Sequence, residues 1–209
     1  MIKGKTYNYF IMLIDTLNTY RILLASKSPR RRELMNGMGL DFEVVTFDVE
    51  ESYDPSMPPE EVVKYLSRIK LSPVDLSQYD PKTLVVACDT IVVVEDRILG
   101  KPHDAQEAAE MLRSLSGRTH TVLSGLTVAT PQRLLTDCCA SEVTFETITD
   151  EEIDYYVRQY RPYDKAGAYG VQEWIGYIGI RSIHGSFYNV MGLPTCMLWK
   201  MLKEVVKEG

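Results

Sequence analysis

Residues 21–34 read RILLASKSPRRREL, and this stretch sets the pattern of the chain. Residues 22–25 are apolar and predict a short buried strand, which a turn of small residues follows. Ser28 is a good N-cap and Pro29 a good first helical residue, so a helix is expected to begin here. The stretch therefore predicts a strand, a tight turn and a helix.

The start of this predicted helix is rich in groups that bind anions. Its backbone N–H groups are unpaired and the helix dipole is positive there, so a negative charge is stabilised. Ser26, Ser28, Lys27 and the arginines at positions 30–32 surround the same spot. A phosphate site is the functional interpretation. A capped surface helix with solvated arginines is the alternative that these residues alone leave open.

The composition is that of a soluble globular protein. The chain has 209 residues, of which 45% are hydrophobic and 25% are charged, and its formal net charge is -6. Proteins that coat nucleic acids usually carry a basic surface, so no nucleic-acid partner is expected. A local basic site in an acidic protein fits a small anionic ligand better.

The first twenty residues predict neither a membrane span nor a signal peptide. The apolar run at residues 9–14 is too short to cross a bilayer, and Asp15 follows it instead of a small-residue cleavage site. We therefore expect no membrane partner. Met12 is an alternative start, and residues 1–20 are interpreted as an N-terminal extension.

The four cysteines, at positions 88, 138, 139 and 196, show no metal-ligand spacing. Adjacent residues such as Cys138 and Cys139 rarely pair with each other. Reduced thiols and a cytoplasmic location are expected. A redox module built on Cys138 and Cys139 is a weak third hypothesis, because the pair lacks the spacing of a reactive dithiol.

Alternating helical and strand patterns early in the chain, followed by hairpins, predict an α/β protein with a mixed sheet. No repeat or linker divides residues 21–209, which are expected to form one domain. Strands are predicted at residues 42–47, 83–94, 119–130 and 134–147, and a second hairpin at 177–181 and 186–190. Helices are predicted from Pro58 to about Lys70, over 105–115 after Asp104, from Thr149 to about Tyr160, and from Pro194.

Asp89 is the most informative single residue, because it interrupts the apolar run at residues 84–94. An unpaired carboxylate there would be costly to bury. It is either a strand-end aspartate bonded to backbone amides, or a metal ligand or general base at the carboxyl end of a strand. Glu50 and Glu51 are candidates for further oxygen ligands to a divalent cation, with a solvated acidic loop as the alternative.

Further polar groups fit the same chemistry. Lys101 lies in a Leu-Gly-Lys-Pro turn and Lys70 near a helix end, where solvated side chains are the simpler interpretation. The loop at residues 164–172 contains two glycines, Lys165 and Tyr169, and suits a flat ligand. Gln172 offers the donor and acceptor that reading a base edge requires. Together these groups predict a nucleotide-hydrolysing site.

Six motifs in order then identify a family resemblance over about residues 21 to 205. The chain resembles the Maf proteins, nucleoside triphosphate pyrophosphatases of the inosine-triphosphatase-like superfamily. The motifs are ASKSPRR at 25–31, CDTIV at 88–92, LGKP at 99–102, LSG at 115–117, DKAGAYG at 164–170 and MGLP at 191–194.

The resemblance implies an elongated mixed sheet flanked by helices, with two lobes and a central cleft. It implies hydrolysis between the α and β phosphates with a divalent cation, Mg²⁺ or Mn²⁺. Asp89 matches the proton acceptor and, together with Glu50, the implied metal site. Substrate choice is implied for Arg30, Thr90 and Gln172, and phosphate binding for Ser26, Arg30, Arg31, Lys70 and Lys101.

The loop sequence AYGVQ at residues 168–172 resembles the subgroup that acts on dTTP and UTP, modified pyrimidine nucleotides included, and not the one that acts on 7-methyl-GTP. The chain departs from the family at Cys88, where alanine is common, and at Glu173 and Trp174, where many members have glycine. A nucleotide-binding regulator of septum formation is the alternative function. A homodimer is the assembly that the resemblance allows.

Overall fold

The structure is a computed structural model, and it describes residues 13–207. Within these residues seven strands form one sheet in the order β2-β1-β3-β5-β6-β7, with β4 paired to β3. The strands are β1 Arg21–Ala25, β2 Glu43–Val45, β3 Thr83–Val94, β4 Arg97–Leu99, β5 Thr119–Ala129, β6 Leu134–Phe145 and β7 Ile180–His184.

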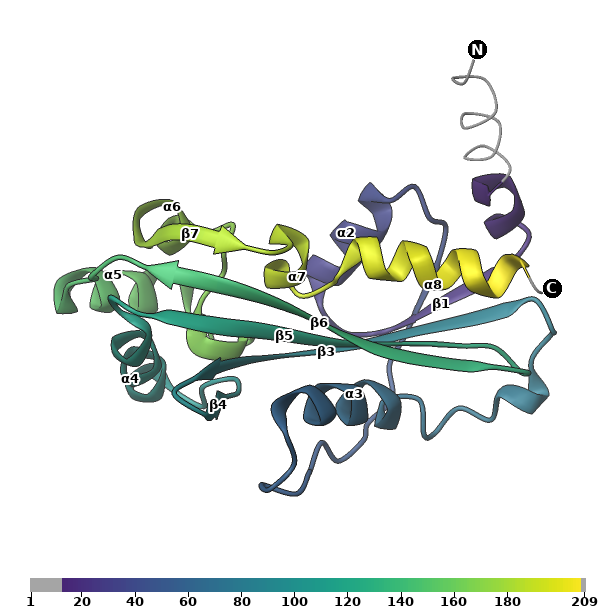
Figure 1. The fold of residues 1–209 in the computed structure, drawn as a ribbon, viewed down its shortest axis with the longest axis horizontal. Helices are drawn as coiled ribbons and strands as arrows, with labels where there is room; N and C mark the ends of the chain where they lie inside the picture. The colour runs from purple at the N-terminus through teal and green to yellow at the C-terminus, as the bar shows by residue number, and fades with distance from the viewer. Residues whose placement is uncertain (1–12, 208–209) are drawn as a thin grey trace, which may run out of the picture.

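The sheet is mixed, as predicted. β1 pairs in parallel with β2 and β3, whereas β3, β4, β5, β6 and β7 pair antiparallel. The long strands β3, β5 and β6 run along most of the molecule and make it elongated (Figure 1). The predicted hairpin of residues 119–130 and 134–147 is confirmed as β5 and β6.

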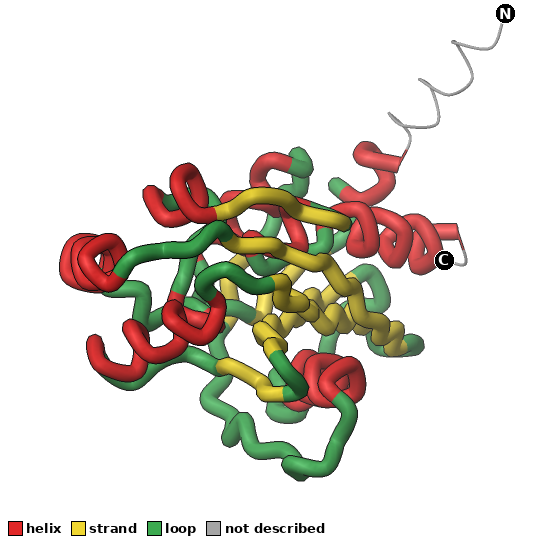
Figure 2. The backbone as a smooth tube through the Cα atoms, turned by 60° about the vertical axis from the view of Figure 1, so that its left-hand side comes forward, coloured by secondary structure: helices red, strands yellow, loops and turns green. Residues whose placement is uncertain are grey.

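Helices cover both faces of the sheet. Figures 1 and 2 show α3 on one face and α8 on the other, with α4, α5 and α6 at the far end of the long strands. The helices are α2 Pro29–Gly37, α3 Pro59–Ile69, α4 Ala105–Leu115, α5 Asp150–Tyr160, α6 Trp174–Gly179, α7 Phe187–Met191 and α8 Thr195–Lys207, and the 3-10 turns are η1 Leu76–Gln78 and η2 Ala166–Ala168.

The predicted helix starts are confirmed at several positions. The Asp104 carboxylate caps α4 by accepting a bond from the Glu107 N–H, and Thr149 and Glu152 form a capping box on α5. Ser28 precedes α2, but its side chain makes no capping bond.

Strand β3 separates two apolar layers by simple alternation. Val86 and Cys88 belong to the main core under α8, whereas Val85 and Ala87 face the opposite side, where Ile91 packs in the cluster that includes α3 residues. Side chains alternate between faces along a strand. Asp89 therefore faces α3, and Thr90 faces the α8 side.

The predicted second hairpin at residues 177–181 and 186–190 is wrong. Residues 174–179 form α6, β7 pairs with β6, and α7 covers most of the second predicted strand. The Ser186 hydroxyl caps α7 by accepting a bond from the Asn189 N–H, and Gly192, at a φ of 113°, ends it. The N-cap and the terminating glycine lie within seven residues and favour a short helix. The alternation of apolar and polar residues in this segment is too short to specify a strand.

Other differences are smaller. β2 is limited to three residues of the predicted 42–47, and residues 97–99, for which no strand was predicted, pair with β3 as β4. Residues 13–17 are helical, and Leu13 and Leu17 pack in the main core. The alternative start at Met12 lies outside the described residues, and the domain boundary at residue 20 stays a prediction. None of the helices in residues 13–207 has the length and apolar character needed to cross a membrane.

Candidate active site

A cleft forms beside the part of strand β3 that has no strand partner on one side. β1 pairs only with residues 83–86 of β3, and β4 pairs only with residues 92–94. Between them, residues 87–91 have no strand partner on that side within the described chain. A cavity of about 440 Å³ opens at this gap, and Asp89 and Thr90 line it.

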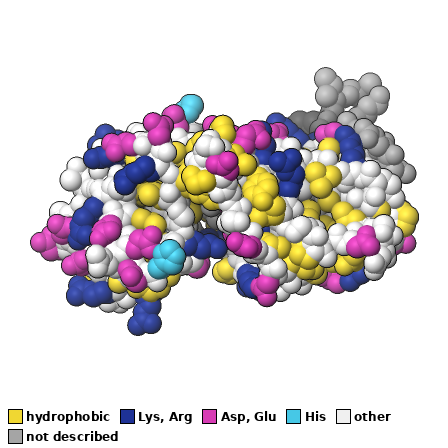
Figure 3. All heavy atoms as spheres, turned by 90° about the horizontal axis from the view of Figure 1, so that it is seen from below, with side chains coloured by type: hydrophobic (Ala, Val, Ile, Leu, Met, Phe, Trp, Pro, Cys, Tyr) yellow, Lys and Arg dark blue, Asp and Glu magenta, His cyan; other side chains and the backbone are white. Residues whose placement is uncertain are grey.

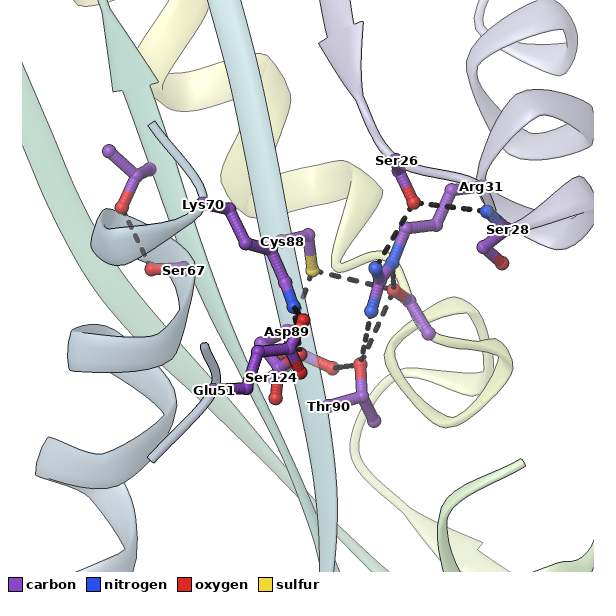
Figure 4. Close-up of polar contacts among 12 residues, drawn as sticks. Ser26, Ser28, Arg31, Glu51, Ser67, Lys70, Cys88, Asp89, Thr90 and Ser124 are labelled. Atoms are coloured by element: carbon purple, nitrogen blue, oxygen red, sulfur yellow. Dashed lines mark hydrogen bonds and ion pairs between the residues drawn. The ribbon is translucent and has the colours of Figure 1, made fainter. Parts of the chain in front are cut away.

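Asp89 therefore lies in the middle of a strand, not at a carboxyl end as the sequence suggested. The gap in the sheet exposes the middle of β3, because the parallel partner β1 has only five residues. Figure 4 shows the result: Asp89 points toward Lys70 and Glu51, and Thr90 points toward Arg31. Both faces of one strand thus contribute to one site.

On the α3 side, one ammonium group bridges two carboxylates. Lys70 Nζ lies 2.8 Å from Asp89 Oδ1 and 2.5 Å from Glu51 Oε1. The Lys70 and Asp89 side chains are each only 14% exposed. Burial opposes ionisation of Glu51, but the bond from Lys70 and the charges of Lys70, Lys101 and Arg31 outweigh it, and the pKa of Glu51 is lowered.

Of the two adjacent glutamates of this loop, Glu51 lines the cavity and Glu50 does not. Glu50 is exposed and lies outside the cavity lining. Both carboxylates lie in one acidic run, and Glu50, predicted as a metal ligand, is not among the residues that line the cavity.

Gly125 explains how Lys70 reaches the site. It pairs with Asp89 across β3 and β5. A Cβ atom at Gly125 would lie 2.0 Å from the Val63 carbonyl oxygen, so only glycine lets α3 approach this strand. Lys70 directly follows α3, and the close approach brings its ammonium to Asp89.

On the other face of β3, Arg31 binds three separate elements. Its guanidinium donates to the Gly192 carbonyl oxygen at 2.8 Å, to Thr90 Oγ1 at 3.2 Å and to Ser26 Oγ at 3.3 Å. Behind it, Thr90 Oγ1 and Ser124 Oγ lie 2.9 Å apart. The start of α2 is therefore fixed against the middle of the sheet.

The cavity is basic although the chain is acidic. Six cationic side chains line it against four anionic ones: Lys27, Arg30, Arg31, Lys70, Lys101 and Lys165 face Asp48, Glu51, Asp89 and Asp164. Figure 3 shows a hollow near the middle of the long axis, with basic side chains beside it. Ser26 also lines the cavity, whereas the exposed Arg32 does not. Such a lining suits a compact polyanion.

One end of the cavity is apolar and carries Gln172. Val92, Val122 and Met191 line it beside the loop of residues 164–172. The side-chain oxygen of Gln172 is buried, and it has no hydrogen-bond partner among the described residues. This end offers a surface for a flat ring and one free acceptor for its edge.

The carboxylates fit a cation shared with a substrate. Residues 13–207 contain no group of three or more His, Cys, Asp or Glu side chains that could hold a metal alone. Mg²⁺, however, is commonly bound through one or two carboxylates together with substrate phosphates. Asp89 and Glu51 already share one positive charge, the Lys70 ammonium, which shows that the pair favours a cation.

Three residues that shape the site had no role assigned from the sequence: Ser124, Asp48 and Glu173. Ser124 is fully buried in β5, and its hydroxyl is hydrogen-bonded to that of Thr90. It could have been found as Asp89 was, because it is a polar residue in an apolar run. Lys27 and Asp48 form an exposed ion pair at the cavity, 2.9 Å apart. Glu173 pairs with Lys165 of the loop of residues 164–172 and accepts a hydrogen bond from Tyr156. Cys138 and Cys139 lie outside the cavity lining.

Comparison with known proteins gives a consistent result. The family model described as Maf-like protein matches residues 21–205. A dTTP/UTP pyrophosphatase of Porphyromonas gingivalis is 48% identical over 194 residues, which is 92% of this chain and 98% of that protein. A dTTP/UTP pyrophosphatase of Bacteroides thetaiotaomicron is also 48% identical, over 92% of this chain and all of that protein.

Among solved structures, the Ham1 protein of Staphylococcus aureus matches with a TM-score of 0.48 and 15% identity. The match covers 88% of this chain and 98% of that one.

Proposed function

This chain belongs to the family of Maf-like proteins, and we propose that it is a nucleoside triphosphate pyrophosphatase that hydrolyses dTTP and UTP, modified pyrimidine nucleotides included. The observation that carries the proposal is the ion-paired Asp89 carboxylate, which faces a basic cavity with an apolar end. The names of the relatives, similar over nearly their whole length, support the substrates.

The cavity orients the nucleotide from end to end. We assign the triphosphate to the basic part, where Ser26, Arg30, Arg31, Lys70 and Lys101 bind it. The base then lies in the apolar end against Gln172. Arginine suits this role because its planar group binds phosphate oxygens in pairs.

Asp89 is assigned as the general base. It takes a proton from a water molecule as the water oxygen attacks the α phosphorus. The bond from that phosphorus to the bridging oxygen breaks, and pyrophosphate leaves with the bonding electrons. The products are the nucleoside monophosphate and pyrophosphate. Lys70 and Arg31 stabilise the charge that develops on the phosphate oxygens.

A divalent cation, Mg²⁺ or Mn²⁺, is part of the proposal. Asp89 and Glu51 would hold it together with phosphate oxygens, and Glu51 replaces Glu50 in this role because it lines the cavity. When bound, the cation neutralises charge on the triphosphate.

Substrate choice is assigned to Arg30, Thr90 and Gln172. Gln172 is the group best placed to read the base, since its side-chain oxygen has no protein partner among the described residues. Thr90 acts through Arg31, which donates a hydrogen bond to its hydroxyl. Arg30 forms an ion pair with Asp164 at 2.8 Å. A cytoplasmic location and a homodimer remain proposals, which cell fractionation and light scattering would test.

Pyrophosphate release from dTTP and UTP with Mg²⁺ or Mn²⁺ tests the activity. Replacing Asp89 with asparagine should lower kcat by about 10³-fold, the scale of a general base, and leave the thermal midpoint close to that of the parent. A parent protein that binds dTTP but releases no pyrophosphate would instead support the nucleotide-binding regulator. Undiminished turnover by the Asp89→Asn variant would contradict the role of Asp89.

A further inference from the structure

Glu173 lies at the centre of polar contacts that the hydrolytic step does not use. Its carboxylate accepts a hydrogen bond from the Tyr156 hydroxyl and lies 3.1 Å from Lys165 Nζ. The Tyr156 oxygen in turn accepts a bond from the Gly170 N–H at 3.0 Å. Tyr156 comes from α5, so the carboxylate connects this helix to the loop of residues 164–172.

These groups are held away from water. Tyr156 is fully buried, and the Lys165 and Glu173 side chains are 8% and 21% exposed. Burial raises the pKa of Tyr156, and its hydrogen bond to Glu173 raises it further, so the phenol stays protonated and donates. Removing one member leaves a buried group without its partner, which is costly.

The backbone of Glu173 closes a turn that contains Gln172. The Glu173 N–H donates to the Gly170 carbonyl oxygen at 3.0 Å. A Cβ atom at Gly170 would lie 2.8 Å from the Glu173 carboxyl carbon, so the side chain folds back against the turn. The turn that contains Gln172 is therefore fixed by two contacts between Glu173 and Gly170, one through the Glu173 backbone and one through its side chain.

The contacts continue to the phosphate end of the cavity. Lys165 Nζ also binds Asp164 Oδ1 at 2.7 Å, and Asp164 Oδ2 accepts a bond from Arg30 at 2.8 Å. The hydrogen bonds from Lys165 and Arg30 hold the pKa of Asp164 below its ordinary value although burial opposes this. A continuous series of ion pairs thus joins Glu173 to Arg30.

We propose that Glu173 is a positioning residue for base selection. It fixes the turn that presents Gln172 to the base and, through Lys165 and Asp164, holds Arg30 at the phosphates. The inference rests on the proposed function, since it concerns how the same cavity discriminates between nucleotides.

The test compares Glu173→Gln and Tyr156→Phe with the parent, using dTTP and CTP. The ratio of the two kcat/KM values should fall by about tenfold in both variants, mainly through a higher KM for dTTP. Glu151→Gln is the matched control, because Glu151 is an exposed glutamate on α5, and its ratio should stay within about twofold. A loss of folded protein alone lowers both kcat/KM values equally and leaves the ratio unchanged.

A double variant distinguishes positioning from a direct contact. If Glu173 acts through Gln172, Gln172→Ala with Glu173→Gln should show the same ratio as Gln172→Ala alone. Additive losses, or an unchanged ratio in folded Glu173→Gln and Tyr156→Phe proteins, would overturn the inference. A parent that releases no pyrophosphate from any nucleotide would refute the proposed function instead, so the two failures can be told apart.

Discussion

Replacing Lys70 with methionine should shift the pH dependence of hydrolysis as well as its rate. The change removes an ammonium that lies 2.8 Å from Asp89 and 2.5 Å from Glu51. At an effective dielectric constant of about 20, a charge pair at the shorter of these separations interacts by roughly 6 to 7 kcal/mol before desolvation is subtracted. Lys70 is also proposed to stabilise the charge that develops on the phosphate oxygens in the transition state. Loss of one such interaction typically lowers kcat by about 10²- to 10³-fold, and this is the loss expected here.

The direction of the pH effect follows from Glu51. Its pKa is lowered in the parent, where the Lys70 bond and nearby cations outweigh burial. Without the ammonium, two carboxylates face each other, and both burial and mutual repulsion favour protonation. The pKa of Glu51 should therefore rise, so activity is lost at a higher pH as the solution is acidified.

Pyrophosphate release measured between about pH 5 and pH 9 checks this prediction, since the acid limb of kcat/KM reports the free enzyme. Lys64→Met is the matched control, because Lys64 lies on α3, the helix that Lys70 directly follows, and pairs with Glu61 outside the cavity. An acid limb at the same pH in the parent and the Lys70→Met variant would refute the coupling between Lys70 and the carboxylates.

Two further predictions concern the neighbours of this group. Glu51→Gln should raise the Mg²⁺ concentration for half-maximal activity by about tenfold or more, whereas Glu50→Gln should leave it unchanged. Metal titrations of both variants check this. A larger effect of Glu50→Gln would instead assign the metal ligand to Glu50. Gly125→Ala should destabilise the fold by about 1–3 kcal/mol, because its Cβ would lie 2.0 Å from the Val63 carbonyl oxygen; thermal unfolding measures it, and an unchanged midpoint would contradict the close approach.

Patterns within single elements predicted much of the fold. Residues 83–94 form β3 with the predicted bounds, and the capping box at Thr149 and Glu152 is present. The error at residues 177–190 arose where a five-residue strand alternates with two short helices. Segments this short contain too few residues to separate a period of 2 from one of 3.6, so their structure is decided by tertiary contacts.

The site was predictable in kind but not in its pairings. Asp89 stood out because burying an unpaired carboxylate in an apolar run costs free energy. Its partner Lys70 lies nineteen positions earlier, and no local pattern connects them. The connection runs through Gly125, which pairs with Asp89 and admits α3. Three segments must pack before the pair exists, so only the folded chain specifies it.

The local sequence does not specify which of Glu50 and Glu51 lines the cavity. Both are adjacent acids in a loop, and a loop has no period that assigns a side chain to a face. The lysine after α3 makes the difference, since its ammonium lies 2.5 Å from Glu51 and draws that carboxylate toward Asp89. An ion pair of this kind, in place before any nucleotide binds, would preorganise two carboxylates for a cation. Lys70 would then set the geometry of the acidic side as well as bind phosphate, which explains why its removal is expected to change both rate and pH dependence.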